Sequence, residues 1–112
     1  MHHRNAKFQL SYILNFVIFV LIMKSILIGY DLNKAGQDYT GLIDKIEKTF
    51  NIWWHHLDST WIVKTDLTCV QIRDILAPFV DSNDELLVVE LSGVGAWHGF
   101  NEKGSKWLKD NL

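Results

Sequence analysis

The chain has 112 residues, of which 48% are hydrophobic and 21% are charged. This balance fits one small globular domain and excludes collagen-like and strongly disordered chains. The formal net charge of −2 and the lack of clustered basic residues argue against a protein that binds by neutralising many phosphates. The single cysteine, Cys69, excludes an internal disulfide and a four-cysteine zinc site, and it indicates the reducing cytoplasm.

The first 22 residues differ in composition from the rest of the chain. They carry two basic residues and no acidic one, and they end in an apolar run over Tyr12–Ile22. Such a start is typical of export signals, but no small-residue cleavage site follows it. Two explanations stay open: residues 1–22 are an anchor that brings the protein to a membrane if they are made and retained, or translation normally begins at Met23. In either case we expect the folded domain to span residues 23–112.

The first predicted element of the domain is a strand over Ser25–Asp31, because this run is rich in β-branched and apolar residues. The segment Asn33–Gln37 (NKAGQ) then predicts a turn. Asp38 can cap a following helix, since its side chain can accept a hydrogen bond from a free backbone N–H group. The apolar side chains of this helix recur at helical spacing: Tyr39, Leu42, Ile43, Ile46 and Phe50.

Two runs rich in aromatic and β-branched residues follow, at Ile52–Asp58 and Thr60–Asp66. No helical pattern separates them, so they predict a β-hairpin. Either Asp66 or Thr68 can cap the second helix, which we expect to end between Pro78 and Asn83.

Glu85–Leu91 (ELLVVEL) predicts the fourth strand, and a Gly-rich segment after it leads to a short C-terminal helix with Trp107 and Leu108. The order βαββαβ predicts a ferredoxin-like α+β fold, with a four-stranded antiparallel sheet and two helices on one face. The other face would carry too much apolar area to stay in water, so we expect a second copy of the chain to cover it. The strand residues behind this expectation are Trp53, Trp54, Trp61, Leu87 and Val89.

Asp31 is the strongest candidate for a catalytic or metal-binding residue, because it ends an apolar strand and can present its carboxylate at an end of the sheet. The alternation of side chains along the strand places Leu27, Gly29 and Asp31 on one face. Gly29 has no side chain, so a second backbone can approach closely there. In a twofold dimer packed through this face, two copies of Asp31 could share Mg²⁺ or another divalent cation. A turn or helix-capping role for Asp31 is the alternative.

Other polar residues are weaker candidates. His55 and His56 are adjacent in a strand, so they point to opposite faces and cannot chelate one metal together. Ser59 lies at the hairpin junction, where its hydroxyl could hold a phosphate or a metal-bound water, and turn formation explains it equally well. A nucleophile elbow, a P-loop and a dinucleotide-binding glycine motif are all missing from the sequence, which argues against nucleotide hydrolysis and dinucleotide redox chemistry.

Four segments together resemble a family of small bacterial proteins labelled SinR-like: MKSILIGYDLNKAGQDYTGLIDKIEK, HHLDSTWIVKTD, NDELLVVELSG and AWHGF. That family is similar, more distantly, to the small CRISPR-associated adaptation endonuclease and to virulence-associated protein D, which are ferredoxin-like homodimers. The shared signatures are a Tyr-Asp pair ending the first strand, here Tyr30 and Asp31, and the run Ser59–Trp61. The resemblance covers the whole predicted domain.

The resemblance implies a homodimeric, magnesium-dependent endonuclease, with RNA as the favoured substrate and DNA as the alternative. In the related families the strand-one aspartates of two subunits are implicated in phosphodiester cleavage, a role that falls on Asp31 here. Ser59 would then position water or phosphate, and Lys34 or Lys64 would contact the nucleic-acid backbone. The expected dimer interface contains Leu27, Gly29 and Trp61.

The acidic balance of the domain favours a second hypothesis. The chain would be a non-catalytic homodimer, part of a toxin-antitoxin or mobile-element defence system, that binds a partner protein or a structured nucleic acid. The two hypotheses differ in whether the two Asp31 carboxylates of a dimer approach each other at a space open to solvent.

Overall fold

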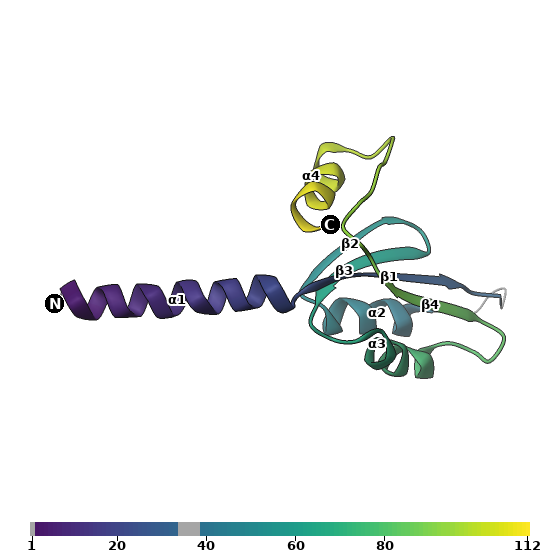
Figure 1. Cartoon of the computed structure of the whole chain (residues 1–112). Coiled ribbons are helices and arrows are strands. Elements are labelled where there is room, and N and C mark those ends of the chain that lie inside the picture. The colour runs from purple at the N-terminus through teal and green to yellow at the C-terminus, as the bar shows by residue number, and fades with distance from the viewer. Residues whose placement is uncertain (1, 34–38) are drawn as a thin grey trace.

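The chain folds as an α+β protein built on one four-stranded antiparallel sheet, and the computed structural model describes residues 2–33 and 39–112 (Figure 1). Its elements in chain order are α1 (His2–Ile22), β1 (Lys24–Asp31), α2 (Thr40–Thr49), β2 (Ile52–Leu57), β3 (Thr60–Thr65), α3 (Cys69–Leu76), the short 3₁₀ helix η1 (Ala77–Phe79), β4 (Glu85–Glu90) and α4 (Glu102–Asn111). The strand order across the sheet is β2-β3-β1-β4, and every neighbouring pair is antiparallel.

Helices α2 and α3 cover one face of the sheet (Figure 1). Alternation along β1 turns Ile26 and Ile28 toward these helices, where they pair with Val63 and Trp61 of β3. The fully or almost fully buried residues of this core are Ile26, Ile28, Leu42, Ile46, Phe50, Trp61, Val63, Ile72 and Leu76. The apolar faces of the strands and of the two helices therefore meet in a single core.

The two helix starts differ. Thr68 caps α3 in a capping box, because its side chain accepts from the backbone N–H of Gln71 while the Gln71 side chain accepts from the Thr68 N–H. The prediction of Thr68 as the cap is confirmed, and the alternative Asp66 is not used. Helix α2 begins at Thr40 after Tyr39, without a side-chain cap, and the expected cap Asp38 lies outside the described residues.

Trp53 and Trp61 do not lie on the face that the sequence suggested, whereas Trp54 does. Trp61 is 0% exposed and packs on the helix side of the sheet. Trp53 contacts it edge to face, with ring centroids 5.1 Å apart, so it lies on the same side. The expectation that Trp61 lies at a dimer interface on the opposite face is therefore wrong, because its register opposite Ile28 turns it into the core.

The C-terminal segment folds back over part of the sheet face opposite α2 and α3 (Figure 1). Trp54 and Ile62 from the sheet pack with Leu108 of α4 in a second apolar cluster. The Ser25 hydroxyl donates a 2.6 Å hydrogen bond to the Asn111 carbonyl, which fixes the end of α4 near the start of β1. The chain itself therefore covers part of the face that we expected a second copy to cover.

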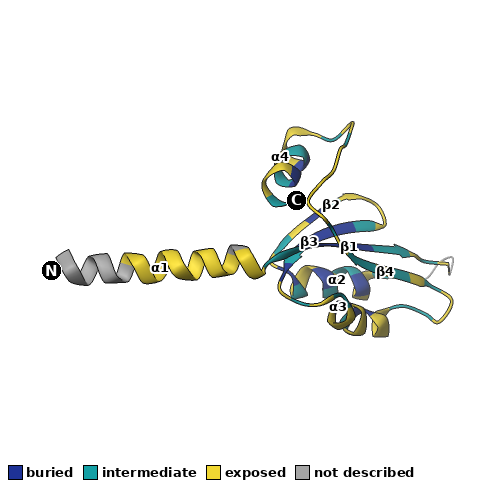
Figure 2. Ribbon diagram, in the orientation of Figure 1, coloured by how far each residue is buried: buried dark blue, intermediate teal, exposed yellow. Residues whose placement is uncertain are grey.

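Helix α1 extends away from the sheet, and its apolar side chains between Leu10 and Ile22 are exposed wherever the structure describes them (Figure 2). The exposed fractions of Leu14, Phe16 and Leu21, for example, are 61%, 62% and 76%. In the part of the chain that the structure describes, no helix is long and apolar enough to cross a membrane.

Candidate functional site

Asp31 occupies the last position of β1 and lies directly opposite Glu85, the first residue of β4. Both residues are exposed. Opposed positions on an antiparallel pair bring their Cβ atoms to about 5 Å, so two carboxylates share one small area of surface. Among the residues that the structure describes, neither carboxylate has an ion pair or a hydrogen-bond partner.

Sequence reasoning missed Glu85 as a site residue. Its place beside Asp31 depends on the pairing of β4 with β1 and on the register of that pair, and neither can be read from a local pattern. The available signal was the position of Glu85 at the start of a strongly apolar strand, with Asp31 at the end of another.

The turn between β2 and β3 reaches the same end of the sheet. The backbone N–H of Tyr30 donates a 3.1 Å hydrogen bond to the Ser59 carbonyl, and an ideal Cβ on Gly29 would lie 4.0 Å from that carbonyl. Ser59 itself is exposed. The structure thus places Ser59 beside the end of β1, one residue from Asp31, on the side away from Glu85.

A network on the helix side of the sheet fixes this end of β1. The Trp61 indole N–H donates to the Tyr30 hydroxyl at 3.1 Å, and that hydroxyl lies 3.4 Å from the Asp58 carbonyl. The His55 ring stacks on Trp61 with centroids 3.8 Å apart, and its Nε2 lies 3.1 Å from the same carbonyl. These contacts tie β1 to the β2–β3 turn, so they position Asp31 and the turn together.

Asp84 holds the loops on the other side of the site. Its carboxylate accepts hydrogen bonds from the Asn33 backbone N–H at 2.9 Å and from the Tyr39 hydroxyl at 3.0 Å. It also accepts from the Asp81 backbone N–H at 2.7 Å. Because Glu85 follows Asp84 directly, this bridge also fixes where β4 begins relative to Asp31.

The two lysines expected to contact nucleic acid do not join this site. Lys64 pairs with Ser25 at the opposite end of β1, and its ammonium donates to the Ser25 hydroxyl at 3.3 Å. Asp31 lies six residue steps along the strand from Ser25, a distance of about 20 Å. Within one protomer, Lys64 is therefore too far away to contact a phosphate bound at Asp31. Lys34 lies outside the described residues.

The sheet face next to Asp31 is only partly covered. The register places Gly29 opposite Leu87, on the same side as the Asp31–Glu85 pair. Leu27 is half-buried and Leu87 is 57% exposed. A shallow hollow of about 410 Å³ runs along this surface and is lined by residues of β1 and β4, Asp31 and Glu85 among them.

The Asp31 and Glu85 carboxylates suit a hard cation such as Mg²⁺, but two ligands are too few to hold it. Carboxylate oxygens are the ligands that Mg²⁺ prefers. One protomer offers two such groups, and its described residues contain no cluster of three or more His, Cys, Asp or Glu side chains placed for a metal. A divalent cation would therefore fit if a second protomer added its own Asp31 and Glu85.

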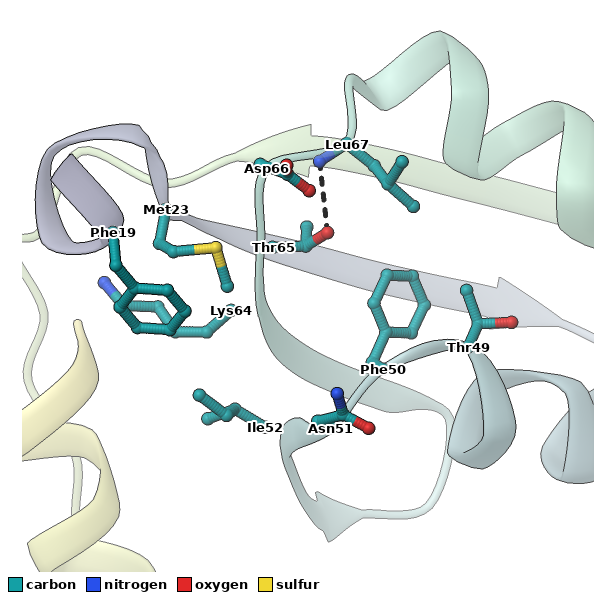
Figure 3. Close-up of a pocket in the computed structure, with 10 residues that line it drawn as sticks. All are labelled: Phe19, Met23, Thr49, Phe50, Asn51, Ile52, Lys64, Thr65, Asp66 and Leu67. Atoms are coloured by element: carbon teal, nitrogen blue, oxygen red, sulfur yellow. Dashed lines mark hydrogen bonds between the residues drawn. The ribbon is translucent and has the colours of Figure 1, made fainter. Parts of the chain in front are cut away.

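A separate hollow of about 340 Å³ lies where α1 joins the sheet (Figure 3). Phe19 and Met23 line it together with Phe50, Ile52 and Lys64. Half of its lining residues are apolar and half are polar or charged, and it lies at the Lys64 end of the sheet, remote from Asp31. This hollow borders the end of α1 and does not extend the acidic site.

No protein-family model matches the chain, and no curated protein or solved structure shows significant similarity to it. The family resemblance therefore depends only on the sequence segments quoted above.

Proposed function

We propose that the chain is a cytoplasmic, homodimeric, magnesium-dependent endoribonuclease with a ferredoxin-like fold. The observation that carries the proposal is the exposed Asp31–Glu85 pair, which has no partner among the described residues and borders an apolar surface. The fold assignment is supported by the element order β1-α2-β2-β3-α3-β4, in which β3 lies between β1 and β2, and β1 lies between β3 and β4.

Dimerisation would complete the site. A twofold axis through the uncovered surface would bring Leu87 and Gly29 of both protomers together, because an isologous interface uses the same patch twice. Each protomer would then supply Asp31 and Glu85, giving four carboxylates around the axis. Four carboxylates gathered around one axis repel each other unless a cation lies between them, so this dimer would need a divalent ion.

In the cleavage reaction, Asp31 and Glu85 would hold the cation, and a divalent cation there would supply positive charge to the scissile phosphate and make water more acidic. The exposed Ser59 hydroxyl, at the same end of the sheet, donates a hydrogen bond to a phosphate oxygen of the substrate. The Trp61–Tyr30 hydrogen bond keeps the β2–β3 turn and the end of β1 in a fixed relation. The side chains of the protein would thus bind the cation and orient the phosphate.

One observation favours the second candidate, a non-catalytic dimer of a toxin-antitoxin or mobile-element defence system. Lys64 lies at the far end of β1, and in the described part of the chain no Lys or Arg pairs with Asp31 or Glu85. An acidic surface without basic neighbours attracts nucleic acid weakly. The same dimer would then use the cation for assembly and bind a partner protein.

Cleavage of end-labelled RNA and DNA oligonucleotides, with Mg²⁺ or with chelator, tests the proposal. We expect Mg²⁺-dependent RNA cleavage that falls at least ~100-fold in Asp31→Asn and Glu85→Gln, because each loses a charge that holds the cation. Glu90→Gln is the matched control, since Glu90 lies at the other end of β4 and should leave the rate unchanged. A dimer without Mg²⁺-dependent cleavage would contradict the nuclease and support the interaction module.

A further inference from the structure

A groove of about 430 Å³ runs along β2, the outer strand of the sheet, and reaches α4. Its lining includes Trp53, Trp54, His55 and His56 from β2, and Lys103 and Trp107 from α4. Its volume lies in the range of small-molecule and nucleotide sites, about 300–1,000 Å³. On the α4 side, the Lys103 ammonium and the half-buried Trp107 ring lie beside the exposed His56 ring. Trp54 is buried beneath the groove, and Trp53 and His55 pack on Trp61 on the other side of the sheet.

The packing of α4 against β2 creates this groove. Trp54 is 3% exposed and contacts Phe100 edge to face, with centroids 5.1 Å apart. A Cβ on Gly104 would lie 3.0 Å from the His56 ring, so the absence of a side chain lets the helix approach that ring. The groove is therefore built by contacts within the fold and does not require a partner to form.

Several polar groups in the groove lack a partner. The Trp54 indole N–H is buried and has no hydrogen-bond acceptor. Lys103 forms no ion pair with any described residue, whereas Lys106 on the same helix is held by Asp110 at 2.7 Å, which raises the pKa of Lys106. Among the described residues β2 pairs with β3 alone, so its outer edge offers backbone donors and acceptors. A ligand with a negative charge and hydrogen-bond acceptors would satisfy Lys103 and the open edge of β2.

We propose that the groove binds a nucleotide unit of single-stranded RNA, with its base stacked on an indole ring and its phosphate at Lys103. Base–aromatic stacking tolerates any base and is the usual means by which proteins hold single strands. An acidic peptide would satisfy Lys103 but would leave the flat ring of Trp107 without a matching surface. The charge and the aromatic rings together favour the nucleotide.

The position of the groove connects it to the acidic site. Leu57 at the end of β2 pairs with Thr60, and Thr60 pairs with Gly29 of β1. Two strand spacings, about 10 Å, therefore separate that end of β2 from β1. RNA binding in the groove does not depend on the proposed cleavage activity. Only its consequence does, namely that an RNA strand held in the groove runs toward Asp31 for cleavage.

Binding can be measured apart from cleavage. The probe is a fluorescein-labelled 2′-O-methyl octauridine, which cannot use its own 2′-hydroxyl in cleavage, and the full chain is titrated in chelator while anisotropy is followed. We expect the dissociation constant to rise about tenfold or more in Lys103→Glu and in Trp107→Leu, in line with the loss of one phosphate contact or one stacked base. Lys109→Glu, a charge reversal on the same helix outside the groove, should bind like the wild type.

An abasic oligomer of the same length is the second probe and should bind about tenfold more weakly than octauridine. Equal affinity for both probes, displacement of RNA by oligoglutamate at the same concentration, or equal effects of Lys103→Glu and Lys109→Glu would overturn the proposal. If Trp107→Leu loses the native circular dichroism spectrum, Trp107→Phe, whose smaller ring stacks less well, provides the stacking test. Binding of octauridine by an Asp31→Asn chain that no longer cleaves RNA would uphold the groove independently of the nuclease.

Discussion

Asp31 and Glu85 face each other across the antiparallel pair of β1 and β4, and no described residue neutralises either carboxylate. Like charges directly opposite in a sheet destabilise it. The pair therefore lowers the stability of the free protein, and a cation bound between the carboxylates would remove this penalty.

The first prediction concerns this repulsion. Without divalent ions, Glu85→Gln should raise the free energy of unfolding by about 0.2–1 kcal/mol, because it removes one of two opposed charges. Mg²⁺ should stabilise the wild type and have no effect on the variant. Urea unfolding with and without Mg²⁺ measures both effects. Equal Mg²⁺ stabilisation of the two proteins would place the cation elsewhere.

The second prediction concerns dimerisation. Leu87→Glu should convert the dimer to monomer, because it places a charge at the centre of the uncovered apolar surface. Val94→Glu is the matched control, since Val94 is 90% exposed in a loop away from that surface. Sedimentation velocity at micromolar concentration, on chains that begin at Met23, separates the two species. A monomeric parent chain would show that this face does not self-associate.

The third prediction concerns α1. Deletion of residues 1–22 should change the stability of the domain by less than about 0.5 kcal/mol, because the described apolar side chains of α1 are mostly exposed. Solubility should rise, since the exposed apolar surface is removed. Urea unfolding of both chains tests this. Loss of a cooperative transition on deletion would show that the contacts around Phe19 are needed for folding.

The fourth prediction concerns Asp84. Asp84→Ala should destabilise the protein by about 1–3 kcal/mol, because donors from three loop positions lose their acceptor at once. Asp74→Ala is the control, since Asp74 is exposed and pairs only with its neighbour Arg73. If Glu85 depends on this bridge for its position, Mg²⁺ stabilisation should fall as well. Thermal unfolding in chelator and in Mg²⁺ measures both quantities.

The strands and helices could be predicted because their patterns are local. The predicted strand Ser25–Asp31 differs from β1 by one residue, and the predicted hairpin ends within one residue of β2 and β3. Thr68 was also among the predicted caps, and the structure adds that Gln71, three residues later, completes a capping box with it.

The faces and partners could not be predicted, because they depend on register and on distant packing. Trp53 and Trp54 are adjacent and must point to opposite faces, but the sequence does not say which face meets the helices. Trp61 was placed on the wrong face for this reason. The C-terminal helix was expected from Trp107 and Leu108, yet its docking on Trp54 is a contact between segments about fifty residues apart.

The two outer strands of the sheet both carry features that oppose endless strand addition. β4 begins and ends with an exposed glutamate, Glu85 and Glu90, and their alternation puts one charge on each face of that edge. β2 is interrupted by a register shift between Trp54 and Leu57. Charged and irregular edges discourage the edge-to-edge growth that leads to fibres. A copy of this sheet that associated with another would therefore do so through a face, where a twofold contact closes on itself and growth would stop at two.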